Sequence, residues 1–179
     1  RGYDIYNVGF TAGIVGLGFV SLFRLFGYKI ATVGILSELD LTAFNTILIA
    51  LFAGMMVLGF VLNGNSLKRY TELLSEKGGL VTDFNALYGI GLTLFNMGLM
   101  GIICFIYLFL TKAPFNGIVL SSVMSVMGFG AMGKHPRNGI PLMFGVFIAT
   151  FLNPGALNPT SAANCALFST AGGPIAGDF

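Results

Sequence analysis

Long uncharged stretches alternate with short charged ones along this chain. The charge-free runs occupy residues 5–23, 41–67, 84–111, 113–133 and 138–177. A helix needs about 20 apolar residues to cross the hydrocarbon core of a membrane, where buried charge is costly. Two runs contain such a helix in full, so we predict membrane-spanning helices at Leu41–Leu62 and Asn85–Leu110. Asp83 is a suitable N-terminal cap for the second helix.

The other apolar runs are too short or too interrupted to cross a membrane alone. Asn7–Phe23 and Asn116–Met132 each have 17 residues and are rich in glycine or serine. Leu142–Leu152 is shorter, residues 153–159 have the composition of a loop, and residues 160–176 are small and weakly apolar. Short segments of this kind beside full-length helices are typical of half-helices and re-entrant elements. These are tolerated where protein buries them or where they line a water-filled cavity.

The composition agrees with this pattern. Apolar residues make up 55% of the 179 residues and charged residues only 9%, against about 25% charged in soluble domains. This excludes a soluble enzyme domain and a disordered chain, and the net charge of +2 argues against a nucleic-acid partner. We predict an all-α integral membrane protein, multi-pass in the inner membrane, with 1–179 as one transmembrane domain. Because the chain begins at Arg1, we expect a fragment of a longer protein.

Polar residues also occur between and within the long helices. Leu67–Lys77 is amphipathic and is followed by two glycines, so we predict a short surface helix with a glycine C-cap. Asn45 and Asn96 lie well inside the two long helices. We expect each to form hydrogen bonds across helices, which stabilise membrane bundles by about 0.6 kcal/mol on average.

An aromatic–Asn pair opens two of the short segments. Tyr6-Asn7 and Phe115-Asn116 are 109 residues apart, and at this offset three small residues of the first segment align with three serines of the second. Three predicted crossings separate the two pairs, so their segments would run in opposite directions. The sequence therefore predicts an inverted repeat with units starting near residues 6 and 115. Such repeats place binding sites near the membrane midplane, where broken helices meet.

The residue types in these segments suit the passage of a small polar solute. An asparagine at the start of a half-helix offers donors and acceptors beside unpaired backbone N–H groups, and small side chains leave room. The predicted pathway is lined by Asn7, Thr11, Gly13, Asn116, Ser121, Ser122 and Ser125. The alternative interpretation is that the asparagines only cap helices and the small residues only pack them together.

One basic cluster contains the single histidine. Lys134, His135 and Arg137 would form a vestibule that attracts anions or lipid headgroups, or His135 would relay a proton. A positively charged turn at the membrane surface is the simpler explanation, because no carboxylate lies nearby in sequence to orient the imidazole. Cys104 and Cys165 lie in apolar runs without metal-ligand spacing, and we expect two small buried thiols.

Four segments carry a resemblance to known families. The chain resembles a family of uncharacterised bacterial polytopic membrane proteins over nearly its whole length. The resemblance is carried by the two aromatic–Asn pairs and by Phe129–Asn138 and Ile140–Val146. More remotely, Tyr6-Asn7 and Phe115-Asn116 resemble the entries to the pore helices of bacterial urea transporters. That resemblance implies an inverted-repeat, homo-oligomeric channel for small neutral solutes. The Leu-Pro…Pro-Phe signature of that family is not clearly present, so only Asn7 and Asn116 carry over.

These observations favour a membrane channel or facilitative transporter for a small, urea-like polar solute. It would act as a homo-oligomer in the lipid bilayer, without a cofactor or metal. The chain has no paired carboxylates and no nucleophile–base set, so we do not expect an enzyme. The alternative function is a non-transporting structural or regulatory subunit of a membrane complex.

Overall fold

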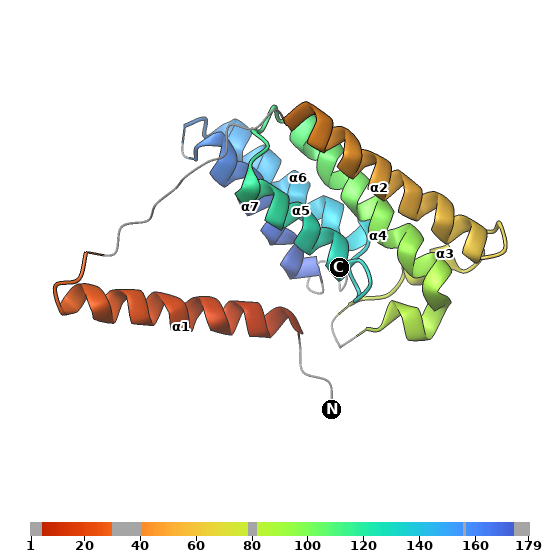
Figure 1. Cartoon of the computed structure of the whole chain (residues 1–179), viewed down its shortest axis with the longest axis horizontal. Coiled ribbons are helices and arrows are strands. Elements are labelled where there is room, and N and C mark those ends of the chain that lie inside the picture. Colours follow the sequence, from red (N-terminus) through yellow and green to blue (C-terminus); the bar gives the residue numbers. More distant parts are fainter. Residues whose placement is uncertain (1–4, 30–40, 79–81, 156, 174–179) are drawn as a thin grey trace. The chain divides into compact units, whose positions relative to one another are not determined.

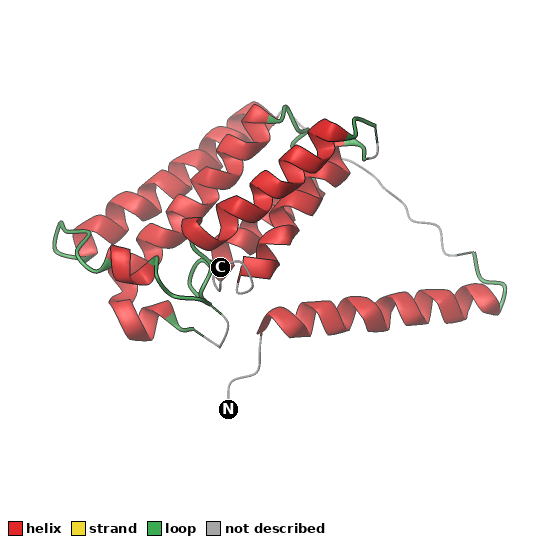
Figure 2. Ribbon diagram, turned by 180° about the vertical axis from the view of Figure 1, so that it is seen from behind, coloured by secondary structure: helices red, strands yellow, loops and turns green. Residues whose placement is uncertain are grey.

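All regular structure in the described part of the chain is helical (Figure 2). The computed structural model describes residues 5–29, 41–78, 82–155 and 157–173, with the side chains of 5–12 and 41–43 left out. The chain divides into two units, Arg1–Leu36 and Ser37–Phe179. Each unit is described by itself.

The first unit contains helix α1 (Ile5–Leu25), which includes the predicted segment 7–23. The helix ends in a glycine turn, because Gly27 has φ of +83°. The N–H of Tyr28 donates to the carbonyl of Phe23 at 3.1 Å and the N–H of Gly27 to that of Arg24 at 3.0 Å. This pair of bonds is the Schellman pattern, which satisfies carbonyls at the end of a helix.

The second unit is built on an antiparallel pair of long helices, α2 (Leu41–Leu62) and α4 (Phe84–Leu110), which lie side by side in Figure 1. Both are long and apolar enough to cross a membrane. They pack through glycines, which allow two backbones to approach closely. A Cβ on Gly98 of α4 would lie 2.5 Å from the carbonyl oxygen of Phe52, and one on Gly59 of α2 would lie 2.5 Å from that of Gly91.

The connection between these helices departs from the prediction. Instead of a helix over 67–77, the structure has one four-residue turn, α3 (Tyr70–Leu73), which starts after Arg69 in the left-handed region. Gly78 has the expected positive φ of +69°, but it lies five residues beyond the helix end and does not cap it. The predicted cap at Asp83 is confirmed, since its Oδ1 accepts from the N–H groups of Asn85 and Ala86 at 2.9 and 3.1 Å.

Three shorter helices complete this unit, and all pack on one side of α4 or on one another (Figure 1). They are α5 (Gly117–Phe129), α6 (Pro136–Leu152) and α7 (Pro159–Ser169), followed by a 3-10 turn at Thr170–Gly172. At 1.5 Å per residue, α5 and α7 are about 20 and 16 Å long, well below the 30 Å of a hydrocarbon core. Neither crosses a membrane by itself.

Two of these helices differ from the expected boundaries. Helix α6 begins at Pro136 rather than after Pro141, because proline is readily accepted in the first turn of a helix. Residues 160–176 were expected to be only a weakly apolar tail, yet most of them form α7 and the turn after it. The signal for α7 is the Asn158-Pro159 dipeptide, an N-cap followed by proline at the first helical position.

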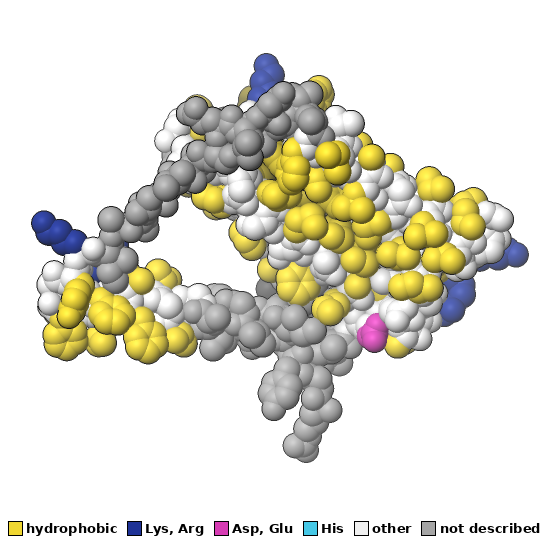
Figure 3. Space-filling model, viewed as in Figure 1, with side chains coloured by type: hydrophobic (Ala, Val, Ile, Leu, Met, Phe, Trp, Pro, Cys, Tyr) yellow, Lys and Arg dark blue, Asp and Glu magenta, His cyan; other side chains and the backbone are white. Residues whose placement is uncertain are grey.

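Apolar side chains fill the interior and also cover much of the surface. The core between α2, α4, α5 and α7 includes Phe52, Met100, Cys104, Val123 and Leu167. On α2 the outward-facing residues are uncharged as well, and Figure 3 shows apolar side chains spread over this side of the unit. A helix that is apolar on all sides belongs in a protein core or in a membrane. The surface of α2 is therefore compatible with lipid.

Candidate functional site

Two side-chain pairs connect α5 to α7, and we call these four residues the polar seam. Near the start of both helices, Nδ2 of Asn116 donates to Oγ1 of Thr160 at 3.2 Å. Further along, the hydroxyl of Ser122 donates to Oδ1 of Asn164 at 2.9 Å. Residue numbers increase together on the two sides, so α5 and α7 are parallel. The seam is a line of polar contacts between two half-length helices that start at the same end of the unit.

Capping asparagines set the position of both helices. Oδ1 of Asn116 accepts from the N–H groups of Ile118 and Val119, both at 3.1 Å. In α7, Oδ1 of Asn158 accepts from the N–H of Ser161 at 2.8 Å. Capping by Asn116 is thus confirmed, and its amide nitrogen remains available for the contact to α7. One side chain serves both as a cap and as a member of the seam.

The predicted pathway residues occupy different places. Ser122 is fully buried in the seam, whereas Ser121 is exposed and donates to the carbonyl of Ile118 at 2.7 Å. Ser125 is half-buried. Gly13 belongs to the first unit, and the side chains of Asn7 and Thr11 lie outside the described residues. Thr160 and Asn164 were missed, although their spacing of four residues places them on one face of a helix.

A second group of polar side chains is buried where the α5–α6 turn meets the α3 segment. We call it the deep polar cluster; it consists of Tyr70, Asn96, Lys134, His135, Asn138 and Thr170. Asn96 of α4 lies at its centre, accepting from the hydroxyl of Tyr70 at 2.9 Å. Its amide donates to the carbonyls of Gly130 and Lys134 at 2.7 and 2.8 Å. Asn96 therefore supplies hydrogen-bond donors to two buried backbone carbonyls at and after the C-terminal end of α5.

Lys134 is buried within this cluster, with only 4% of its surface exposed. Its ammonium donates to Oγ1 of Thr170 at 2.7 Å and lies 5.2 Å from the centre of the Phe129 ring. Loss of hydration disfavours the charged form of a buried amine. Burial accordingly lowers the pKa of Lys134 to about 8. The ammonium form still prevails at neutral pH.

His135 connects the α5–α6 turn to the segment after α3. Its Nε2 lies 2.7 Å from the carbonyl oxygen of Glu76, so Nε2 carries the proton that is donated. Nδ1 is buried and has no hydrogen-bond partner among the described residues. Burial and the neighbouring Arg137 lower the pKa of the imidazole, although Glu76 opposes them. The ring stacks on Phe84, with centres 6.4 Å apart.

The basic cluster of the sequence is thus divided between two environments. Lys134 and His135 are interior residues, and only Arg137 is exposed, so the cluster is not the surface turn that the sequence favoured. Asn138 fixes the turn, because its Oδ1 accepts from the N–H of His135 at 3.0 Å and its Nδ2 donates to the carbonyl of Gly133 at 2.9 Å. Sequence reasoning missed Asn138, Tyr70 and Thr170.

Other predicted polar and thiol groups have mixed outcomes. Asn96 forms the expected cross-helix bonds, but Oδ1 of Asn45 is buried without a partner among the described residues. Cys104 is buried and Cys165 is exposed, both as free thiols. In the described part of the chain, no group of three or more His, Cys, Asp or Glu side chains could hold a metal ion.

A cavity of about 310 Å³ opens beside the start of α7. Its polar lining includes Tyr107, Thr111, Thr150 and Asn153, and the first turns of α7 form another wall. The cavity lies at the same end of the unit as the N-terminal caps of α5 and α7. It is large enough to admit a small polar molecule.

Comparison with known proteins places this region in a family. The family described as "Protein of unknown function (DUF1576)" matches residues 62–179, which is more than half of the chain. The chain belongs to this family. The matched region extends from the last residue of α2 to the C-terminal end, so the family covers both the polar seam and the deep polar cluster. Neither the curated proteins nor the solved structures give a match.

Proposed function

We propose that the chain forms part of a membrane channel or facilitative transporter for a small polar solute, with the polar seam lining part of its path. The proposal includes a multi-pass location in the inner membrane. Two helices long and apolar enough to cross a membrane, and the uncharged surface of α2, support this location. Lipid contact explains why so many large apolar side chains are exposed.

The seam is the observation that carries the proposal. Many membrane transporters build their sites from discontinuous helices, and two half-length helices with polar side chains between them supply elements of this kind. Polar positions follow the length of α7 and the 3-10 turn after it, from Thr160 through Asn164 to Thr170, over about 15 Å at 1.5 Å per residue. The cavity beside Asn153 adjoins the first of these positions, and Lys134 meets the last.

The charge along this path favours a neutral solute. The described seam residues are amides and hydroxyls, which exchange hydrogen bonds with a solute without ionising it. The ammonium of Lys134 at the inner end disfavours cations, as positive groups do in other membrane pores. The inverted repeat between α1 and α5, the homo-oligomer and the remote resemblance to urea transporters belong to this proposal as predictions.

The test is solute-driven swelling of proteoliposomes with urea, acetamide and glycerol. Asn164→Leu fills the seam with an apolar side chain, and the hydroxyl of Ser122 then donates to its alternative acceptor, the carbonyl of Ile118 at 3.1 Å. We expect lower permeability than for the parent protein. Cys165→Leu is the matched control, because it introduces the same side chain at the neighbouring residue of α7, which is exposed. Its permeability should equal that of the parent.

One observation favours the alternative, a non-transporting structural or regulatory subunit. Val119 and Val123, which flank the seam, are fully buried, so the contact between α5 and α7 is closely packed. For a subunit of this kind, vesicles containing the parent protein would be no more permeable than protein-free vesicles. That result would contradict the transport proposal.

A further inference from the structure

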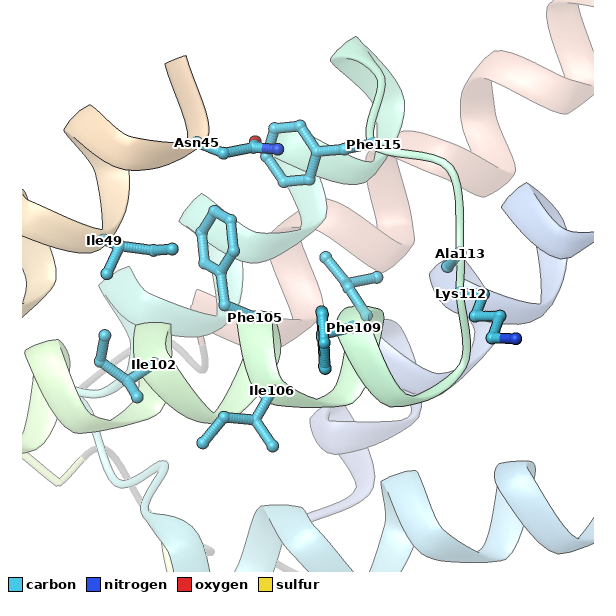
Figure 4. A pocket seen from close by; sticks show the side chains of 10 residues that line it. Asn45, Ile49, Ile102, Phe105, Ile106, Phe109, Lys112, Ala113 and Phe115 are labelled. Atoms are coloured by element: carbon cyan, nitrogen blue, oxygen red, sulfur yellow. The ribbon is translucent and has the colours of Figure 1, made fainter. Parts of the chain in front are cut away.

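A second cavity of about 610 Å³ lies between the start of α2 and the end of α4, and we call it the α2–α4 groove (Figure 4). Its lining residues are mostly apolar. Figure 4 shows Ile102, Ile106 and Phe109 along α4, with Lys112 just beyond the end of that helix. From α2 come Asn45 and Ile49. The groove contains none of the four residues of the polar seam and shares one lining residue, Ala113, with the cavity beside α7.

The lining changes from polar to apolar along the helix axes. Because α2 and α4 are antiparallel, Asn45 near the start of α2 and Lys112 after the end of α4 lie at the same end of the pair. Ile49 is one turn deeper along α2. Ile102 is ten residues before Lys112, or about 15 Å deeper at 1.5 Å per residue. The groove thus has a polar end and an aliphatic end, as an amphiphile has.

Both polar groups at that end fit a ligand of definite chemistry. Asn45 lines the groove and its Oδ1 has no hydrogen-bond partner among the described residues, so rotation of the side-chain amide would let this acceptor bind a headgroup hydroxyl. Lys112 is exposed at the rim and carries a positive charge. Basic residues at the ends of membrane helices attract anionic headgroups.

We propose that the α2–α4 groove binds a phospholipid whose headgroup is anionic and bears hydroxyl groups. The phosphate pairs with Lys112, a headgroup hydroxyl donates to Asn45, and an acyl chain lies against Ile49, Ile102 and Ile106. The proposal rests on the membrane location that forms part of the proposed function, and it does not depend on solute transport. Charge complementarity at one end and the aliphatic wall at the other favour a lipid over a second copy of the chain.

The absence of tryptophan from the sequence provides a sensitive test. Phe109→Trp places one fluorophore in the groove at a side chain that is 82% exposed, where the larger ring is readily accommodated. Ile47→Trp is the control, since Ile47 lies at the same end of α2, is 64% exposed and does not line the groove. Each variant is reconstituted with brominated phosphatidylglycerol, brominated phosphatidylcholine, or a brominated anionic lipid with a methyl-ester headgroup.

We expect the apparent affinity reported by the fluorophore at position 109 to be about fivefold higher for the methyl-ester anionic lipid than for phosphatidylcholine, the effect of one lysine on an anionic lipid, and higher again for phosphatidylglycerol. The fluorophore at position 47 should not discriminate. Adding Lys112→Ala should remove the preference for the methyl-ester lipid over phosphatidylcholine and reduce the preference for phosphatidylglycerol. Adding Asn45→Ala should remove only the advantage of phosphatidylglycerol over the methyl-ester lipid.

Two results would overturn the proposal. Equal quenching by all three lipids at position 109 would mean ordinary lipid contact. Weak quenching by every lipid at 109, with strong quenching at 47, would mean that another protein surface covers the groove. Swelling assays on the same vesicles keep the two proposals apart, because a headgroup preference without solute permeability would contradict only transport. Permeability without the preference would contradict only the lipid site.

Discussion

The long-helix pair and the short-helix group of the second unit are held together by different interactions. Between α2 and α4 the contacts are glycine against backbone, as at Gly59 and Gly98, with apolar side chains around them. Among α5, α6 and α7 the buried contacts include amides, hydroxyls, an ammonium and an imidazole. Asn96 belongs to the long helix α4 but directs its side chain to the short-helix group.

This difference supports placing the proposed site in the short-helix group. Close packing of apolar helices needs only small residues at the contact, and it supplies a rigid support. Buried polar groups cost free energy unless each is paired, so their concentration in one region needs a reason beyond stability. The short-helix group is also wholly inside the region matched by the family, whereas most of α2 precedes it.

The largest expected effect is at the junction of the two regions. Asn96→Leu leaves the hydroxyl of Tyr70 and the carbonyls of Gly130 and Lys134 without their partner, at about 1–3 kcal/mol for each buried group. We expect a loss of about 3 kcal/mol or more, measured by thermal unfolding in detergent. Tyr70→Phe removes one of these bonds and should cost about 1 kcal/mol. Equal stability of Asn96→Leu and the parent would contradict the central role of Asn96.

A smaller loss is expected within the long-helix pair. Gly98→Ala places a Cβ 2.5 Å from the carbonyl oxygen of Phe52, and overpacking of this kind costs about 1–3 kcal/mol. Gly54→Ala is the matched control on α2, since a Cβ there meets no atom within 4 Å. Alanine favours a helix more than glycine does, so the control should be neutral or slightly stabilising. If both variants unfold alike, the helices do not depend on close approach at Gly98.

The stability of the folded protein should depend on pH through the buried imidazole of His135. The pKa of His135 is lowered in the folded protein, so the unfolded chain binds the proton more readily. The contribution of His135 is therefore complete above the ordinary value of 6.5 and is lost as the pH falls through the folded pKa. His135 is the chain's one histidine, and carboxylates titrate near pH 4. Thermal stability should decrease as the pH falls below about 6.5.

His135→Gln provides the control, because glutamine retains an N–H donor for the carbonyl of Glu76 but does not titrate in this range. Its stability should be independent of pH where that of the parent changes. A parallel decrease in both proteins would assign the effect to other groups.

The two regions also differ in how far the sequence predicts them. Uninterrupted apolar runs predicted the bounds of α2 and the end of α4 at Leu110. Asp83 was recognisable as a cap because its hydrogen-bond partners are the backbone N–H groups that follow it in the sequence. Capping by Asn116, one of the two interpretations that the sequence left open for it, has the same local basis. Each of these predictions depends on neighbouring residues alone.

The buried polar contacts depend on residues far apart in the sequence. Ser122 meets Asn164 and His135 meets Glu76 only because the chain reverses direction between them. No local pattern distinguishes the buried Ser122 from the exposed Ser121. Burial of Lys134 was likewise unpredictable, since a lysine in a turn is ordinarily solvated and its partner Thr170 lies 36 residues away.

The smallest expected effect on stability, and the sharpest test of function, is Asn116→Asp. Aspartate caps a helix as well as asparagine, and its charge is favoured at a helix N-terminus. The contact with α7 also persists, because the hydroxyl of Thr160 can donate to a carboxylate in place of accepting from the amide. Because Asn116 is only 6% exposed, the cost of burying a charge offsets part of this gain, and thermal stability should change by about 1 kcal/mol or less. If the polar seam conducts a neutral solute, however, a charge at its mouth should alter proteoliposome permeability to urea, acetamide or glycerol. Unchanged permeability to all three, together with unchanged stability, would leave Asn116 as a cap alone and contradict its place in a pathway.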